Sequence, residues 1–121
     1  MPEDSYRLPE ITVHDLAEWM RSKPDLILLD VREPSEVAFA GISDPRVINV
    51  PMSVLSRMQL KGLPEAVSPD KEIVVLCHVG GRSSQVVYWL SARQGYTNIY
   101  NLRGGIEAYA AEIDPSIPRY A

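Results

Sequence analysis

The chain has a single cysteine, Cys77, and its neighbours are suited to a reactive sulfur. An apolar run, residues 73–76, leads into this cysteine. The residues that follow it are His78, Val79, Gly80, Gly81, Arg82 and Ser83. Glycines let a backbone turn its N–H groups toward one centre, and a helix beginning at Ser83 adds partial positive charge from the same direction. Arg82 adds a positively charged guanidinium that can donate two parallel hydrogen bonds to an anion. The segment therefore predicts a thiolate at Cys77, the nucleophilic form, and suits a terminal persulfide anion equally well.

This arrangement predicts a specific reaction, the transfer of sulfur through Cys77. A donor such as thiosulfate carries a sulfonate-like group that Arg82 can bind while the thiolate attacks the outer sulfur. Sulfite then leaves, and a second thiol or cyanide removes the sulfur from the protein. This chemistry needs no metal and no organic cofactor. The plainer alternative is a buried structural cysteine, because free cysteine is among the most buried residue types. The Gly-Gly-Arg loop and the helix start after Cys77 favour the reactive interpretation.

The elements that must position this loop alternate between apolar runs and amphipathic segments. Strands are expected to begin at Ile11 and to cover residues 26–30, 47–50, 73–76 and 98–100. Helices are expected over residues 13–22 and 34–40, from Ser53, from Ser83 to near Gly95, and after Gly105. Such alternation predicts an α/β fold, a mostly parallel sheet with helices on both faces. Ligands bind outside the carboxyl ends of the strands in such sheets, where residues 30–32, 50–51, 77–83 and 101–105 would lie.

Size and composition limit the possible organisation and partners. The chain has 121 residues, 45% of them hydrophobic, which predicts one domain with a core over about residues 11–115. The formal net charge is −4 and the basic residues are scattered, so neither nucleic acid nor an anionic membrane is an expected partner. No apolar run approaches the roughly 20 residues that span a bilayer, and the first residues do not form a secretion signal. With no export signal and no internal disulfide, we expect a cytoplasmic protein. A monomer is the default expectation for its oligomeric state.

Three segments of the chain resemble motifs of the rhodanese family. The first is Asp30-Val31-Arg32 with Glu36 beyond it, similar to the family's early Asp-x-Arg element. The second, residues 77–83, is similar to its Cys-x-x-Gly-x-Arg active loop. The third, residues 101–109, is similar to its late Leu-x-Gly-Gly-x-x-Ala-aromatic element. The motifs occur in the family's order, and the resemblance extends from about Ile11 to Ala110.

The resemblance implies a five-stranded parallel sheet and a persulfide-forming cysteine at Cys77. It also implies transfer of sulfane sulfur from a thiosulfate- or mercaptopyruvate-type small-molecule donor to a thiol, to cyanide or to a protein. The chain departs from the family pattern at two places. Residues 41–46 replace the usual Gly-His-Ile-Pro-Gly-Ala, and Tyr109 stands where a tryptophan is usual.

The remaining candidate residues have secondary roles. The loop residues 78–83 and Arg32 are the candidate substrate-binding residues. Arg32 and Asp30 are also expected to pair at the end of their strand. Asp30 and Glu36 are assigned structural support of the loop. His78 is expected to point outward, because a thiolate needs no general base.

Other functions remain open at this point. Phosphatases and arsenate reductases use a similar cysteine cradle, but with five residues between cysteine and arginine. Here only four residues separate Cys77 from Arg82, which narrows the cradle toward a single sulfur atom. A non-catalytic rhodanese-like binding or regulatory module is a second alternative, and such proteins usually lose the cysteine. The sequence also does not separate a small-molecule acceptor from a protein acceptor.

Overall fold

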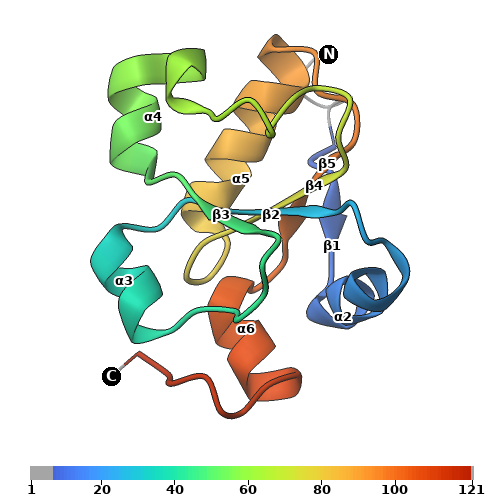
Figure 1. Ribbon diagram of the computed structural model, residues 1–121, viewed down its shortest axis with the longest axis vertical. Coiled ribbons are helices and arrows are strands. Elements are labelled where there is room, and N and C mark those ends of the chain that lie inside the picture. Colours follow the sequence, from blue (N-terminus) through green and yellow to red (C-terminus); the bar gives the residue numbers. More distant parts are fainter. Residues whose placement is uncertain (1–6, 121) are drawn as a thin grey trace.

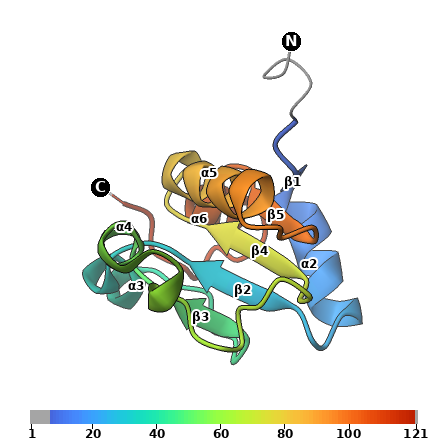
Figure 2. The same ribbon diagram turned by 90° about the horizontal axis from the view of Figure 1, so that it is seen from above.

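The sheet at the centre of the molecule has five strands, all parallel. The computed structural model describes residues 7–120. Its strands are β1 (Glu10–Ile11), β2 (Ile27–Asp30), β3 (Val47–Asn49), β4 (Ile73–Leu76) and β5 (Ile99–Leu102). They lie in the order β1-β5-β4-β2-β3, so β4 is the central strand (Figure 1). Figure 2 looks onto the sheet, where β3 and β1 form the two edges. This architecture confirms the predicted parallel α/β fold.

Helices connect the strands, and their local sequences explain most of their bounds. They are α2 (Val13–Ser22), α3 (Pro34–Phe39), α4 (Met52–Met58), α5 (Gly81–Tyr88) and α6 (Gly105–Glu112). A short 3₁₀ segment, η1 (Gln59–Gly62), extends α4, and a π-helical segment, η2 (Trp89–Arg93), extends α5. α2 begins with a capping box, in which Thr12 and Asp15 each accept the other's backbone N–H. α3 has Pro34 in its first turn, where a missing N–H costs nothing.

Two helices begin earlier than the sequence indicated. α4 starts at Met52 with Pro51 as its N-cap, and Ser53 instead donates a hydrogen bond to Glu33. α5 starts at Gly81 with Gly80 as its N-cap, so Ser83 lies inside the first turn rather than before it. The second difference matters for the site, because it brings the first amides of α5 closer to Cys77.

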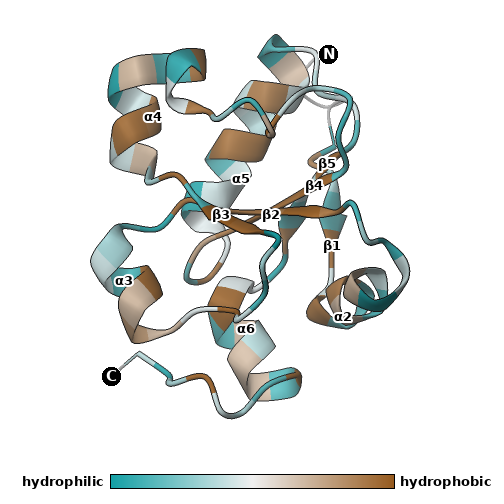
Figure 3. Ribbon diagram, viewed as in Figure 1, coloured by the Kyte–Doolittle hydropathy of each residue, from teal (hydrophilic) through white to brown (hydrophobic). Residues whose placement is uncertain are grey.

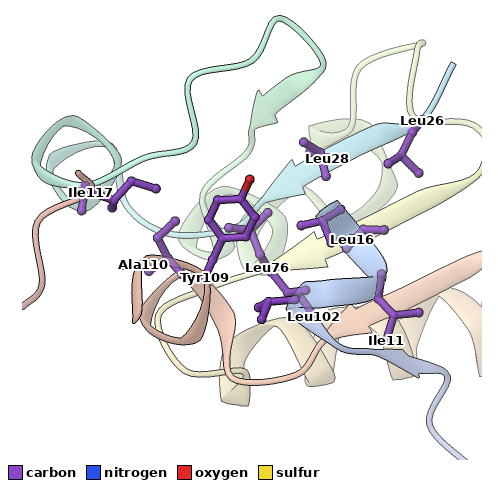
Figure 4. Packing of buried hydrophobic residues seen from close by; sticks show 13 residues of the cluster. Ile11, Leu16, Leu26, Leu28, Leu76, Leu102, Tyr109, Ala110 and Ile117 are labelled. Carbon is purple, nitrogen blue, oxygen red and sulfur yellow. The ribbon is translucent and has the colours of Figure 1, made fainter. Parts of the chain in front are cut away.

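Alternating residues of the strands divide the core between the two faces of the sheet. Leu28, Val74 and Leu76 pack with residues of α2 and α6 on one face (Figure 4). Leu29, Val75 and Cys77 pack with residues of α4 and α5 on the other face. Because both faces are covered, β4 is apolar along its whole length and β2 is apolar up to Asp30, and both are largely brown in Figure 3. The period of two therefore directs Cys77 toward α5.

The helices of the described chain are short. Between residues 7 and 120, none of them has both the length and the apolar character that a membrane crossing requires.

Candidate active site

Cys77 lies directly after the last residue of β4, at the carboxyl end of the central strand. Its side chain is buried, with only 1% of the residue exposed. The edge of a parallel sheet beyond the carboxyl ends of its strands is the usual place for a ligand. The sulfur is therefore buried at the carboxyl edge of the sheet rather than on the surface.

Backbone amides converge on this sulfur. The N–H of Gly80 donates to the Cys77 Sγ at 3.1 Å, and the N–H of Ser83 donates to it at 3.3 Å. Gly80 has φ of +111°, a conformation that side chains rarely adopt, which explains the glycine at this turn. Two N–H groups and the amino end of α5 provide fixed positive charge around the sulfur, so the nest expected from the sequence is present in the geometry.

The Ser83 hydroxyl adds a third polar contact to the sulfur. Its Oγ lies 3.3 Å from the Cys77 Sγ and 2.5 Å from the Asn101 Oδ1, to which it donates. Asn101 in turn donates through Nδ2 to Glu10, at 3.2 Å. The hydroxyl has one proton and two acceptors within reach, so it can turn that proton toward the sulfur when the sulfur becomes anionic.

The amino end of α6 holds the other side of the loop. The N–H of Ile106 donates to the carbonyl of Cys77 at 2.9 Å, and the N–H of Glu107 donates to the carbonyl of His78 at 3.0 Å. Figure 1 shows this contact as the yellow loop between β4 and α5 resting on the start of α6. Because α6 holds these two carbonyls, the following amides are free to face the sulfur.

Arg82 forms a bidentate ion pair with Glu36 of α3. Its Nη1 and Nη2 lie 2.8 Å and 2.9 Å from the two carboxylate oxygens. These hydrogen bonds lower the pKa of Glu36 to about 2 and raise the pKa of Arg82. Both terminal nitrogens of Arg82 are thus engaged, and a donor's oxygens would compete with Glu36 for them.

Comparison with known proteins agrees with this geometry. The model of the family described as "Rhodanese-like domain" matches residues 12–112. The chain belongs to the rhodanese-like family. A protein of Allochromatium vinosum named "Sulfurtransferase" is 34% identical over 101 residues, which cover 84% of this chain and 87% of that protein. The crystal structure of a rhodanese-related protein from Thermoplasma volcanium has a TM-score of 0.69 and 32% identity, and the match covers 93% and 99% of the two chains.

A longer relative contains this type of domain as one part. "Rhodanese-like/PpiC domain-containing protein 12, chloroplastic" from Arabidopsis thaliana is 42% identical over 93 residues. The matched region is 77% of this chain but only 30% of that protein. The chain therefore spans under a third of that relative's length and most of the length of the Allochromatium protein.

Arg32 of this rhodanese-like domain is an internal residue. Its side chain is 0% exposed and forms two hydrogen bonds with Asp30, at 2.9 Å and 2.6 Å. Asn49 closes the strand end by donating to the backbone carbonyls of both residues at 2.9 Å. The expected pairing of Asp30 and Arg32 is thus present, and the guanidinium is buried against its partners. Arg32 reaches the site only through Glu36 and Tyr120, to which its Nη1 donates.

His78 differs from expectation. It is not directed into solvent, because its ring stacks on Tyr120 with centroids 3.6 Å apart, and its Nε2 lies 3.4 Å from Glu107. The outermost side chain of the loop is Val79, which is 58% exposed. Between residues 7 and 120, no three His, Cys, Asp or Glu side chains gather as a metal site would require.

The sequence interpretation did not assign roles to Asn101 and Tyr120. Asn101 lies at the strand end that topology had indicated, but only the fold shows its contact with Ser83. Tyr120 lies beyond the expected core and carries no periodic signal, so nothing in the sequence indicated its contacts with the site.

The low pKa of Glu36 gives a testable pH dependence. A carboxyl whose pKa is depressed in the folded state stabilises the protein above its unfolded pKa, and the benefit is lost as pH falls. The stability difference between the wild type and Glu36→Gln should therefore be largest near pH 6. It should shrink as pH falls from about 4.5 toward about 2.

Urea unfolding at pH 6 and pH 3 measures this difference. Because the pair is partly exposed, its contribution at pH 6 should be only about 1 kcal/mol. Glu18→Gln, which removes a carboxylate from the exposed pair with Arg21, is the control for losing a surface charge. A stability difference of equal size at both pH values for Glu36→Gln would contradict the assignment.

Proposed function

We propose that this rhodanese-like domain is a sulfurtransferase that carries sulfane sulfur as a persulfide on Cys77. The observation that supports this most directly is the convergence of the Gly80 and Ser83 amides on the sulfur. The first intrahelical bond of this turn runs from the Ser84 N–H to the Gly80 carbonyl, so the amides of residues 81 and 82 precede it and suit a bound anion. Arg82, in the first turn of α5, is also close enough to Cys77 to interact with it electrostatically.

Loading is the first half of the proposed cycle. The Cys77 thiolate attacks the outer sulfur of a thiosulfate-like donor, and a new S–S bond forms. The old S–S bond of the donor breaks, and sulfite leaves with the electron pair. The persulfide keeps the single negative charge of the thiolate on its outer sulfur. The amides of α5 and the Ser83 hydroxyl stabilise that charge in both states.

Transfer to an acceptor completes the cycle. An acceptor thiolate or cyanide attacks the outer sulfur, and the bond between that sulfur and Cys77 breaks. The thiolate of Cys77 is regenerated, so the protein returns to its starting state with no net oxidation. We propose that the acceptor is a thiol of a small molecule or of a protein. A reducing compartment such as the cytoplasm would keep the free Cys77 available.

Arg82 has a revised role in this proposal. Its guanidinium is paired with Glu36, so its main function is to fix α3 against the loop and to place positive charge beside Cys77. Direct binding of the donor's oxygens would need the ion pair to open. The four residues between Cys77 and Arg82 favour one sulfur atom over a phosphoryl group in the cradle, which argues against a phosphatase.

The test is the intact mass of the protein after incubation with thiosulfate. We expect a gain of one sulfur, about 32 Da, that cyanide or a thiol removes. Because Cys77 is the only cysteine, a gain of this kind reports on one residue. A thiol that reacts with iodoacetamide but gains no sulfur from thiosulfate or mercaptopyruvate would argue for a binding module instead.

A further inference from the structure

The segment after α6 returns to the active site. Its residues lie outside the region matched by the family model, which ends at residue 112. Ile117 is buried in the core on the face covered by α2 and α6, near Tyr109 and Ala110 (Figure 4). Figure 1 shows the segment passing from the end of α6 toward α3, where the described chain ends. The segment is thus anchored to the domain, and its last described residue, Tyr120, lies beside the loop.

The ring of Tyr120 contacts the residue next to the reactive sulfur. It stacks on the imidazole of His78 with an interplanar angle of 9° and a centroid distance of 3.6 Å. The ring of Phe39 lies nearly perpendicular to it, with an interplanar angle of 82° and centroids 5.9 Å apart. Arg119 pairs with Glu107, which is itself 3.4 Å from the His78 Nε2. Two adjacent residues of the segment therefore hold His78, one through stacking and one through a carboxylate.

The hydroxyl of Tyr120 contacts the ion pair on the opposite side of the loop. It accepts a hydrogen bond from the Arg32 Nη1 at 2.9 Å and donates one to the Glu36 Oε1 at 3.1 Å. The same carboxylate binds Arg82. Burial raises the pKa of Tyr120, which keeps the donating O–H protonated. One phenol oxygen thus links the buried Arg32 to the ion pair that holds the first turn of α5.

We propose that Tyr120 is a positioning residue for the chemistry of Cys77, fixing His78 through its ring and the Glu36–Arg82 pair through its hydroxyl. The proposal rests on the sulfur transfer described above. Tyr120 does not contact the reacting sulfur. It acts on the two ends of the loop, at residues 78 and 82, between which the amide of Gly80 must keep its direction. Small displacements of such groups reduce rates strongly, because the donors must meet the developing charge.

Two variants separate the roles of the ring and the hydroxyl. Tyr120→Phe keeps the stacked ring and removes the link to Arg32 and Glu36, whereas Tyr120→Ala removes both. We expect kcat/KM for sulfur loading from thiosulfate to fall about threefold in Tyr120→Phe and at least about tenfold in Tyr120→Ala. Tyr100→Phe is the matched control, since its hydroxyl binds Asn98 outside the site, and its loading should equal that of the wild type.

Two readouts distinguish positioning from a general loss of stability. The chain has only two histidines, so proton NMR should show the His78 ring signals shifted upfield by Tyr120, with those of His14 as an internal reference. The shift should persist in Tyr120→Phe and disappear in Tyr120→Ala. The second readout is the ratio of Cys77 alkylation rates with iodoacetate and with iodoacetamide. This ratio should fall about threefold in Tyr120→Ala, because Arg82 loses its fixed place beside the sulfur.

The outcomes separate this proposal from the proposed function. If the wild type gains no sulfur, the sulfurtransferase assignment fails, while the alkylation ratio still tests whether Tyr120 positions Arg82. If the wild type loads sulfur and a folded Tyr120→Ala protein matches it in both loading rate and alkylation ratio, the positioning role is overturned. Restored loading in Tyr120→Phe relative to Tyr120→Ala assigns the larger part of the effect to the ring.

Discussion

Replacing Cys77 by serine is expected to abolish sulfur loading, with a loss of at least about a thousandfold in rate. A hydroxyl at this position cannot form a persulfide, and no other cysteine is present to replace it. Intact mass after incubation with thiosulfate should therefore show no added sulfur in Cys77→Ser. Sulfite release, measured in parallel, should fall to the background rate of the buffer.

The fold of Cys77→Ser should remain close to that of the wild type. A serine oxygen can still accept the N–H groups of Gly80 and Ser83, so no buried donor loses its partner. We expect the free energy of unfolding to change by less than about 2 kcal/mol. A folded Cys77→Ser protein that turned over thiosulfate at the wild-type rate would exclude the persulfide mechanism.

Replacing Gly105 by alanine should give the largest structural effect. Gly105 has φ of +58°, and an added Cβ would lie 2.5 Å from the carbonyl oxygen of Cys77 and equally close to that of His78. Both neighbours are backbone atoms that cannot rotate away, so α6 must move off the loop. We expect a loss of about 3 kcal/mol or more in unfolding free energy, measured by urea unfolding. Sulfur loading should also fall at least about tenfold, because the loop loses its platform.

Gly95→Ala is the matched control for this variant. Gly95 also has a positive φ, +80°, but an added Cβ would meet nothing within 4 Å. The unfolding free energy of Gly95→Ala should therefore fall only by the cost of the left-handed conformation, about 1 kcal/mol. Its sulfur loading should be unchanged. If the two variants were equally destabilised and loaded sulfur equally well, close packing of α6 on the loop would not be what requires Gly105.

The sequence predicted the fold and indicated Cys77 as the candidate reactive residue, because both inferences depend on local patterns. Apolar runs such as residues 73–76 specify buried strands, and alternation with amphipathic helices leaves few arrangements other than a parallel sheet. The position of Cys77 between such a run and a glycine-containing loop then follows from chain order. The pairing of Asp30 with Arg32 could be predicted from the sequence for the same reason, since only one residue separates them.

Only the tertiary structure decided which charged and aromatic groups contact one another around the loop. Arg82 meets Glu36 across 46 positions of sequence, and Tyr120 meets His78 across 42 positions. Neither contact follows from a local pattern, because each requires helices and a terminal segment from different parts of the chain to meet at one edge of the sheet. The sequence therefore indicated Cys77 as the candidate residue. The fold showed that Arg82 is paired with Glu36 and that Tyr120 packs against His78 of the loop.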